Sequence, residues 1–531
     1  MVQPSQAWLE KFDGTLVPET FVRITYAMTE PGLQDDALPS TNGEASFSTV
    51  SSVTNTNKNY TLAKYATGEL NLTVLDGSLS IPDLSSVQDA GYISSECVAE
   101  TWHPSITFSF SSVHDISIPG VSITWSETFN EWATRFKVTV YNGTSELFSI
   151  VVEGNDSVVS SVEHELVNYD SIKIEILEWC LPSRRARVET VQFGSSIVFT
   201  KDSILSYEHE SERDPISGQL PKDSISFSID NSEQTWNPLN PEGMFRYLYE
   251  QQPVSVEYGM DVNGTVEWIN GGQYYLSEWS VPANGIEASF TARDAFAYLM
   301  TSQYTGRMYG TLYQMAYDAL ELLGESVATF RISDELKNYS TDITKEDKSK
   351  YKNADILQMV ANAAGMALYQ TRDSVIVIDR VTDLSLARSV IAGEITEMNN
   401  YKYPEIEFLS PIRNVSTSIT KVAATGNTTK DYSYPEKPSG SGATQTVSNL
   451  VVSDDVLSQE RNILTEAYKV LSNRKKATLE YRASPHFDAL DYVRIHHQFG
   501  YSSVLLVTRF VYKYTGAFMG TVTGYMLEDV E

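Results

Sequence analysis

The feature that most constrains the fold is a series of short alternating segments and turn dipeptides between positions 225 and 296. Ile225, Phe227 and Ile229 alternate with serines, which is the two-residue period of a half-buried strand. Asn-Pro, Asn-Gly and Gly-Gly pairs then interrupt the chain, because the residue before proline is extended and glycine accepts positive φ. Further strands are expected over 254–258, 272–279 and 286–291. The pattern predicts an antiparallel barrel or sandwich.

Length and composition indicate several globular domains. The chain has 531 residues and 41% hydrophobic content, enough for roughly three or four domains that each have a core. Cys97 and Cys180 form neither a disulfide framework nor a Cys-x-x-Cys metal pair, which fits folding in a reducing cytosol. Residues 1–30 lack the features of a signal peptide, and no stretch approaches about 18 apolar residues. We therefore expect neither export by a signal peptide nor stable membrane association.

The net charge disfavours a role in binding nucleic acid. Binding to phosphates depends on Lys and Arg side chains that displace counterions. Here 69 Asp and Glu residues face 39 Lys and Arg residues, for a formal net charge of −30. We therefore expect no specific binding of DNA.

Two sets of phrases resemble the hub proteins at the tail tip of bacteriophages that infect Gram-positive hosts. The first set is FSIDN (227–231), WNPLNPEG (236–243), VEYG (256–259), YYLSEW (274–279) and ASFTARD (288–294). The second set is YRASP (481–485), DALD (488–491) and YKYTGAFMG (512–520). Together with the opening residues, these phrases extend the resemblance over nearly the whole chain. The family forms the ring that closes the tail tube.

A change in composition indicates an inserted module. Between about 40 and 194 the chain is rich in Ser, Thr, Val and Asn, and short strands recur at nearly even spacing, as is typical of a β-sandwich. Strands are expected over 68–75, 105–110, 120–125, 135–141, 147–152, 171–178 and 186–193. The phrases at 65–67, 75–77, 169–172 and 185–194 resemble the galactose-binding-like jelly roll that is inserted in many such hubs.

Helical periodicity follows the alternating region. Apolar residues recur at spacings of three and four from Leu312 to Leu323, and Gly324 provides a stop. A second helix is expected over 354–364, with Asn353 as its N-cap. Two short strands over 366–369 and 375–378 then predict a hairpin that packs on these helices.

The last part of the chain combines a polar segment, a helix and strands. Residues 424–447 are rich in Gly, Ser and Thr and predict a flexible loop or a partner-binding arm. A helix is expected over 456–475, where acidic residues before it and basic residues at its end complement the helix dipole.

The resemblance implies a mainly β fold with α+β parts. It contains two antiparallel β-barrel hub domains like those of tail tubes, an inserted jelly-roll β-sandwich and a small α/β accessory domain. The expected segments are hub barrel I in two parts (1–39 and 197–300), the inserted sandwich (40–196), the accessory domain (301–400) and the closing hub barrel (401–531).

The sequence contains no recognisable catalytic motif. The chain has no Gly-x-Ser-x-Gly motif, and His164-Glu165 lacks the second histidine of a zinc protease helix. His496 and His497 are adjacent in an expected strand, so their side chains point to opposite faces. Asp488 and Asp491 are best interpreted as shaping the start of a strand, and Arg184, Arg185 and Arg187 as a solvated strand edge. We expect no catalytic residue, no cofactor and no metal.

Sugar binding by the inserted module is a separate hypothesis. Glycan sites often stack a sugar ring on an aromatic side chain, but an aromatic residue on a sandwich strand is more often part of the core. Trp125 and Tyr141 lie in expected strands and are assigned to the core. The weak candidates for glycan contact are Trp102, His103 and Trp132.

The resemblance implies a structural protein of the virion that is synthesised in the cytoplasm of a bacterial host. We expect a homotrimer at the tail tip whose paired barrels imitate a six-fold ring. Its expected partners are the distal tail protein, the tape-measure protein and receptor-binding proteins or fibres, with a host surface glycan as a further ligand. Phage DNA would pass through the lumen without specific binding, and the acidity would either repel it or only keep the protein soluble. The alternatives are a carbohydrate-binding adhesin and a cell-wall-degrading enzyme.

Overall fold

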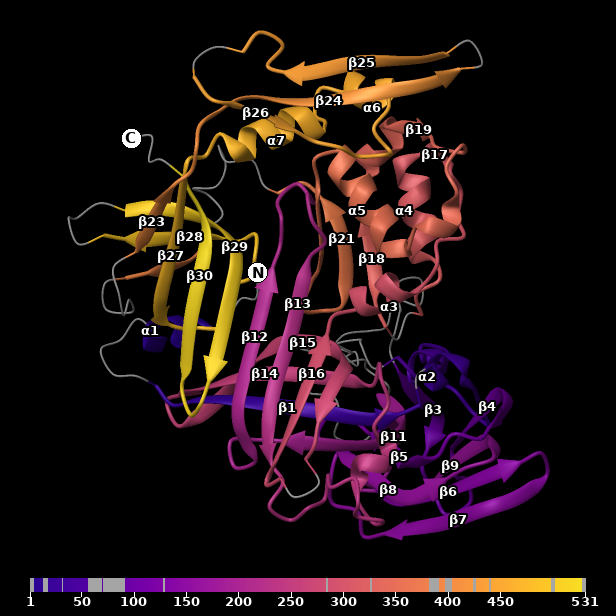
Figure 1. Cartoon of the computed structure of the whole chain (residues 1–531). Coiled ribbons are helices and arrows are strands. Elements are labelled where there is room, and N and C mark those ends of the chain that lie inside the picture. The colour runs from indigo at the N-terminus through magenta and orange to yellow at the C-terminus, as the bar shows by residue number, and fades with distance from the viewer. Residues whose placement is uncertain are drawn as a thin grey trace.

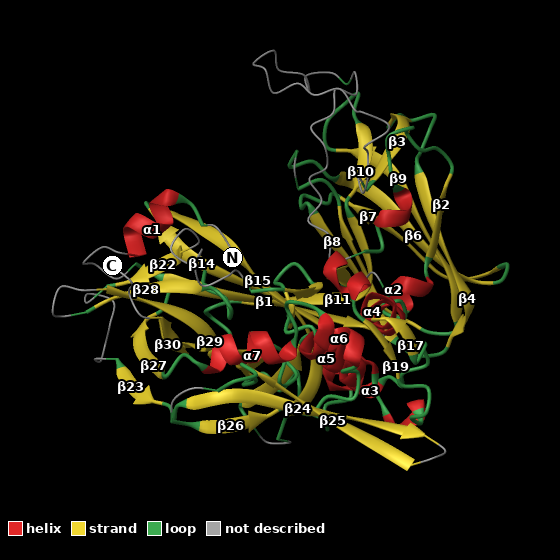
Figure 2. Ribbon diagram, turned by 90° about the horizontal axis from the view of Figure 1, so that it is seen from above, coloured by secondary structure: helices red, strands yellow, loops and turns green. Residues whose placement is uncertain are grey.

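The computed structural model of the chain describes residues 4–12, 18–30, 32–55, 69, 91–127, 129–282, 285–324, 327–381, 391–396, 404–423, 426–438, 441–497 and 502–527. These residues form several β-sheets with a few short helices (Figures 1 and 2). The predicted mainly β class with α+β parts is confirmed. The division into five segments stays a prediction. Within the described residues, no helix has the length and apolar character needed to cross a membrane.

The largest sheet joins strands from the beginning, the middle and the end of the chain. Its first group is β12 (Ile204–Glu212), β13 (Lys222–Asp230), β14 (Pro253–Val262), β15 (Thr265–Ser280), β16 (Glu287–Arg293) and β1 (Thr20–Thr29). Its second group is β22 (Ile391–Ile395), β23 (Glu405–Phe408), β27 (Lys475–Arg482), β28 (Tyr492–His496), β29 (Ser502–Tyr514) and β30 (Phe518–Leu527). Antiparallel pairing of β12 with β29 joins the two groups edge to edge (Figure 1). The short helix α1 (Gln6–Phe12) also reaches the second group, since the Trp8 indole N–H donates to Ser484 Oγ at 3.0 Å.

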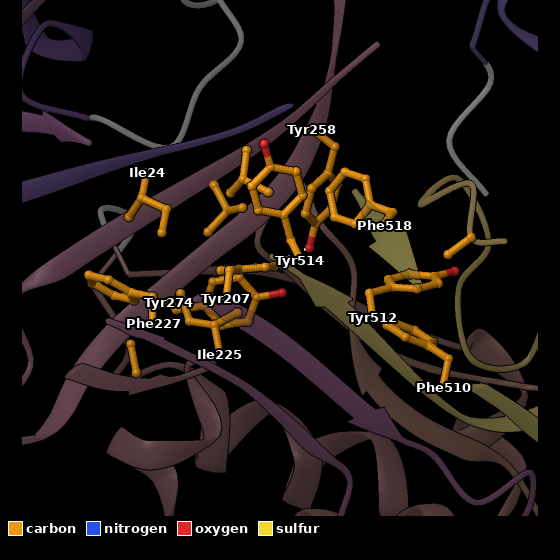
Figure 3. Packing of buried hydrophobic residues seen from close by; sticks show 14 of the residues in the cluster. Ile24, Tyr207, Ile225, Phe227, Tyr258, Tyr274, Phe510, Tyr512, Tyr514 and Phe518 are labelled. Atoms are coloured by element: carbon orange, nitrogen blue, oxygen red, sulfur yellow. Dashed lines mark hydrogen bonds between the residues drawn. The ribbon is translucent and has the colours of Figure 1, made fainter. Parts of the chain in front are cut away.

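One hydrophobic core runs through both groups of strands. Alternation places Tyr207 on β12 and Ile225 and Phe227 on β13 inside, together with Phe510 and Tyr512 from β29 (Figure 3). The strands predicted from the FSIDN and ASFTARD phrases are β13 and β16, and they pair in register from Ser224 opposite Arg293. The two strand groups therefore share packing as well as hydrogen bonds.

The module between β1 and β12 has two sheets and a core of its own. One sheet has the order β2 (Leu38–Thr41), β4 (Ser105–His114), β9 (Tyr169–Trp179), β6 (Ala133–Asn142) and β7 (Ser145–Glu153). The other contains β11 (Thr190–Phe199), β5 (Ile118–Thr124) and β8 (Val159–Leu166), and a separate pair is β3 (Tyr92–Cys97) with β10 (Arg185–Val188). Phe108 on β4 meets Phe193 on β11 edge to face, with ring centroids 5.1 Å apart. The galactose-binding-like identity of this module stays a prediction. The strand expected over 68–75 and the phrases at 65–67 and 75–77 lie outside the described residues, apart from Glu69.

Strand β11 belongs to the module and to the large sheet at once. Its residues 190–193 pair with β5, and its residues 194–199 pair with β1. Gly194 stands at the change of partner with φ +142°, and a Cβ there would lie 2.0 Å from the Met28 carbonyl oxygen. Only glycine allows the two backbones to approach so closely.

The accessory region has the expected helices and hairpin. It contains α3 (Phe296–Thr301), α4 (Leu312–Leu320), α5 (Asn353–Ala363) and a sheet of β18 (Thr329–Ile332), β21 (Val375–Asp379) and β20 (Ala367–Gln370). The hairpin predicted over 366–378 is the antiparallel pair β20–β21. Asn353 is the first residue of α5 and its cap is Lys352, so the predicted N-cap is wrong by one residue. Short elements nearby and elsewhere are β17 (Tyr309–Thr311), β19 (Ser340–Asp342), α2 (Leu33–Asp36) and 3₁₀ turns at Val50–Ser52, Met244–Tyr247, Asp334–Asn338 and Lys348–Lys350.

The prediction of a flexible loop over 424–447 is wrong, because most of this segment forms strands. β24 (Ile412–Ala423) pairs with β25 (Gly426–Tyr434) and with β26 (Ala443–Thr446). Glycine and serine are concentrated at 439–442, between β25 and β26, while β25 has threonines and the half-buried Tyr432, which packs against the accessory core. Residues 424–425 and 439–440 lie outside the described part.

The single helix predicted over 456–475 is also wrong. Two helices form instead, α6 (Asp454–Ser458) and α7 (Ile463–Leu471), and residue 475 already begins β27. Asn462 explains the break, because its side chain accepts from the N–H groups of Leu464 and Thr465 and so starts a new helix. Both helices contribute to the core of the accessory region and not to the core of the large sheet.

Candidate functional site: a polar sheet face shared by both strand groups

The large sheet has one buried face and one polar face. On β12, Tyr207 and His209 point into the core, so the intervening Glu208, Glu210 and Glu212 lie on the opposite face. The same alternation places serines of β13 and β16 and the basic residues of β29 on that face. We call this surface the shared polar face.

Register brings the side chains of the shared polar face into rows that cross the β12–β29 junction. The first row is Thr478, Thr523, Arg509, Glu212 and Lys222. The second row is Glu480, Thr521, Val511, Glu210, Ser224 and Arg293. The third row is Arg482, Met519, Lys513, Glu208, Ser226, Thr291 and Glu278. The surface is therefore continuous from one strand group to the other.

Ion pairs and hydroxyl pairs cover this face. Arg509 contacts Glu210 at 2.8 Å and Lys513 contacts Glu208 at 2.9 Å, so both ion pairs bridge the β12–β29 junction. Arg293 contacts Glu278 at 3.4 Å near the far end. Hydroxyl pairs join neighbouring strands at Ser226 with Thr291 (3.3 Å), Ser228 with Ser289 (3.0 Å) and Thr478 with Thr523 (3.1 Å). A surface whose cations already face carboxylates, and whose remaining groups are largely hydroxyls, offers few sites that hold a phosphate backbone.

A buried polar cluster lies beneath the shared polar face. His209 contacts Asp223 at 2.7 Å and the Tyr258 hydroxyl at 2.7 Å, and Arg213 contacts Asp223 at 3.1 Å. Burial alone would raise the pKa of Asp223, but His209 and then Arg213 outweigh it and lower this pKa to about 2. Arg213 also donates to the carbonyls of Ala489 and Gln370, so the cluster connects both strand groups with the accessory sheet.

A second arginine makes a three-way junction. Arg372 lies on the turn between β20 and β21, and its Nε donates to Asp488 at 2.8 Å. Its other nitrogens donate to the carbonyls of Asn270, Pro485 and Phe487 at 3.1, 2.7 and 2.9 Å. Burial would raise the pKa of Asp488, but Arg372 and Arg213 hold it below the usual range. One guanidinium therefore ties the accessory hairpin to both strand groups.

Asp491 shapes the turn that precedes β28. Its carboxylate accepts from the Asp488 N–H at 2.9 Å, in the role expected from the sequence. Burial and the neighbouring Asp488 raise its pKa to about 6. The turn borders a cavity of about 320 Å³ between the strand groups and the accessory region, whose walls include Arg213, Arg331 and Tyr369. The sequence contains no signal for this junction, because Arg213 and Arg372 stand in no motif.

Arg184 and Arg187 are buried and Arg185 is half-buried, so the predicted solvated strand edge is wrong. Arg184 contacts Glu131 at 3.2 Å, and Arg187, which is 1% exposed, forms an ion pair with Glu69. Carboxylates distant in sequence compensate these charges. The two cysteines of this module, Cys97 and Cys180, are free thiols.

The glycan candidates occupy different environments. Trp102 and His103 are half-buried just before β4, and the His103 carbonyl accepts from Asn42 at 2.9 Å. Trp132 is half-buried against the module core, and its indole N–H donates to the Asn155 carbonyl at 3.0 Å. Trp125 is fully buried, in agreement with its assignment to the core, whereas Tyr141 is half-buried and lies outside the module core. Glycan contact by Trp102, His103 and Trp132 stays a prediction.

The adjacent histidines have different partners. His496 contacts Glu394 at 2.9 Å, whereas His497 contacts Ser503 at 2.7 Å. His164 stacks on Phe148 with ring centroids 3.7 Å apart. Over the residues that the structure covers, no three His, Cys, Asp or Glu side chains gather in a way that could hold a metal ion.

Comparisons with known proteins give structural similarity only. No family model matches the chain, and no curated protein sequence matches it. A tail protein from Neisseria meningitidis MC58 is similar with 12% identity and a TM-score of 0.40 over 63% of this chain and 94% of that one. The 43 kDa tail protein of prophage MuSo2 from Shewanella oneidensis has 11% identity and a TM-score of 0.41 over 62% and 94%. The prophage tail protein gp18 from Listeria monocytogenes EGD-e has 13% identity and a TM-score of 0.38 over 62% and 91%. All three of these solved structures are described as tail proteins.

Proposed function

We propose that this chain is a structural hub at the tip of a phage tail, where three copies form a ring that closes the tail tube. The observation that carries the proposal is the edge-to-edge pairing of β12 with β29. It joins two sheet-built units side by side and gives them one continuous polar face, as the wall of a ring requires. Two units packed face to face would have buried that surface.

The shared polar face is the proposed lining of the lumen. On this face Glu208 and Glu210 form ion pairs with Lys513 and Arg509, so these charges offset one another, and hydroxyl pairs cover part of the rest. Such a wall offers few free cations to a phosphate backbone. Duplex DNA would pass such a wall without sticking. The role is mechanical: the tip is closed before infection and opens after host contact.

The proposed partners follow from this position. The distal tail protein lies above the ring, the tape-measure protein reaches into the lumen, and receptor-binding proteins or fibres surround it. The inserted module, with Trp102, His103 and Trp132, is the proposed place for any contact with a host glycan. We propose no catalytic activity, no cofactor and no metal for this chain, and a virion location after synthesis in the host cytoplasm.

Electron microscopy of the full-length chain, concentrated until it assembles, tests the proposal. We expect a three-fold ring in which β12, β13, β29 and β30 line a bore that admits duplex DNA. Strand groups that turn the shared polar face outward or bury it would contradict the proposal. Clearing of purified peptidoglycan by the chain would instead favour a wall-degrading enzyme, and glycan binding by a chain that forms no ring would favour an adhesin.

A charge-reversal pair tests the lumen assignment separately. Glu208→Lys with Glu210→Lys reverses two charges on the shared polar face, whereas Glu146→Lys with Glu153→Lys reverses two exposed charges on β7 of the inserted module. If the face lines the bore, the first variant alone retards the passage of DNA through assembled particles. Equal behaviour of both variants would contradict the assignment.

A further inference from the structure

Strand β23 is the last strand at one end of the large sheet. Within the described residues it pairs with β27 alone, from Glu405 opposite Thr478 to Phe408 opposite Lys475. Phe408 is 68% exposed and Ile406 is 39% exposed. An exposed apolar edge strand is a template for pairing with another chain, and native proteins normally cover such an edge.

The other end of the shared polar face is the second half of β15. Residues 265–275 of this strand pair with β14, whereas residues 275–280 pair with β16. After Leu276, which bonds to the backbone of Gln251 and Gln252, the side of β15 away from β16 has no strand neighbour among the described residues. Residues 277–280 therefore form a second free edge, equal in length to β23.

We infer that β23 of one copy of this chain pairs with residues 277–280 of the next copy. The inference rests on the proposed ring and names its subunit contact. The two edges lie at opposite ends of one face, at the left of the sheet in Figure 1 for β23 and beyond β16 for β15. Joining unlike edges is a head-to-tail contact, which closes into a ring when the rotation between copies allows it.

The side chains on the core side of the two edges are apolar in both cases. On β23, Ile406 lies on the same side as the buried Ala477 of β27, and Phe408 follows on that side. On β15, Trp279 lies on the core side, half-buried, and Val281 follows it on the core. Pairing that keeps the core sides together would set Ile406 and Phe408 of one copy beside Trp279 and Val281 of the next.

The polar sides of the two edges carry both signs of charge. β23 presents Glu405 and Glu407, both exposed. The edge of β15 presents the exposed Glu278, and behind it Arg293 on β16 contacts Glu278 at 3.4 Å while its side chain is 48% exposed. Glu405 and Glu407 would therefore come near one carboxylate as well as the partly exposed guanidinium of Arg293. The joined edges would extend the shared polar face without interruption.

Solution mass measurement of the full chain over a range of concentrations tests the pairing. The variant Phe408→Asp places a charge in the proposed contact, and its matched control, Val198→Asp, does so at an exposed residue of β11 that pairs with Thr25 of β1. Both side chains are exposed, so neither variant should unfold the chain, which a thermal melt verifies. We expect Phe408→Asp to weaken trimer formation by about tenfold or more, as the loss of a buried aromatic contact implies, and Val198→Asp to leave it unchanged.

The outcomes distinguish failure of the β23 contact from failure of the proposed ring. Trimers of Phe408→Asp with unchanged affinity would overturn the pairing and leave the ring intact, and loss of trimers in Val198→Asp alone would move the contact to β11. A wild-type chain that stays monomeric at every concentration would overturn both ideas. As a second test, chains with Glu407→Cys are mixed with chains with Ser280→Cys and oxidised, because residue 407 lies opposite the exposed Ser280 in this register. Peptide mapping should find the link between positions 407 and 280, and a link between two copies of position 407 would overturn the head-to-tail contact.

Discussion

Replacing Arg372 with methionine tests whether one guanidinium holds three parts of the chain together. Methionine keeps the length and most of the apolar contact of the side chain but removes every donor. Asp488 and the carbonyls of Asn270, Pro485 and Phe487 then lose the donors that Arg372 gives them. Removing one partner of a buried ion pair costs about 3 to 5 kcal/mol, because the other charge stays buried, although Arg213 still offsets part of the charge of Asp488. We expect a loss of that size in the free energy of unfolding.

Urea denaturation, followed by tryptophan fluorescence, measures the loss, and a matched control gives its scale. Arg135→Met removes an exposed arginine that contacts Glu153 at 2.9 Å and should cost less than about 1 kcal/mol. The double variant Arg372→Met with Asp488→Asn removes both charges and should recover part of the loss. Hydrogen exchange should also show faster opening of 485–491 in Arg372→Met.

The pH dependence gives the sign of the effect. The pKa of Asp488 is lowered in the folded protein, so its ionisation stabilises the fold above the unfolded pKa, and this contribution is lost as pH falls through the folded pKa. Without Arg372 the pKa of Asp488 should rise, and the difference between wild type and variant should shrink toward acid pH. A loss below about 1 kcal/mol at neutral pH, or a double variant no more stable than the single one, would refute the reasoning.

Two further predictions concern the inserted module and its attachment. Burial would lower the pKa of His114, but the hydrogen bonds that its ring donates to Asp36 and Glu30 raise it. Its contribution to stability is therefore complete below the usual histidine pKa of about 6.5 and is lost as pH rises through the folded value. Thermal melts should therefore show that His114→Gln destabilises the chain more at pH 6 than at pH 9, and a pH-independent difference would contradict this. Gly194→Ala should cost well over about 1 kcal/mol in urea denaturation, because its Cβ would lie 2.0 Å from a backbone oxygen of β1, whereas Gly264→Ala, with open space around it, should cost about 1 kcal/mol; equal losses would contradict the close approach.

Local patterns in the sequence predicted local structure well. The alternation at Ile225, Phe227 and Ile229 gave the buried face of β13, and the apolar spacing from Leu312 gave α4. These features depend on neighbours within a few residues, so periodicity reports them directly. The break between α6 and α7 also has a local signal, since Asn462 is a strong helix-capping residue inside the predicted helix.

Contacts between distant segments escaped prediction for a physical reason. Glu208 pairs with Lys513 and Arg187 with Glu69, and in each case the partner is chosen by packing and not by spacing in the chain. The same holds for Arg372, whose turn resembles an ordinary polar hairpin until Asp488 is brought beneath it. The shared polar face could be anticipated from alternation on each strand, but its continuity depends on the β12–β29 pairing.

The unbroken course of β11 has a mechanical consequence. Because a single backbone carries ladder bonds to β5 on one side of Gly194 and to β1 on the other, the inserted module is not suspended on a flexible tether. A tilt of the module must twist or slide β11 against β1, so the displacement would reach the large sheet directly. A force on the inserted module would therefore be transmitted to the large sheet through β11 and not through a flexible linker.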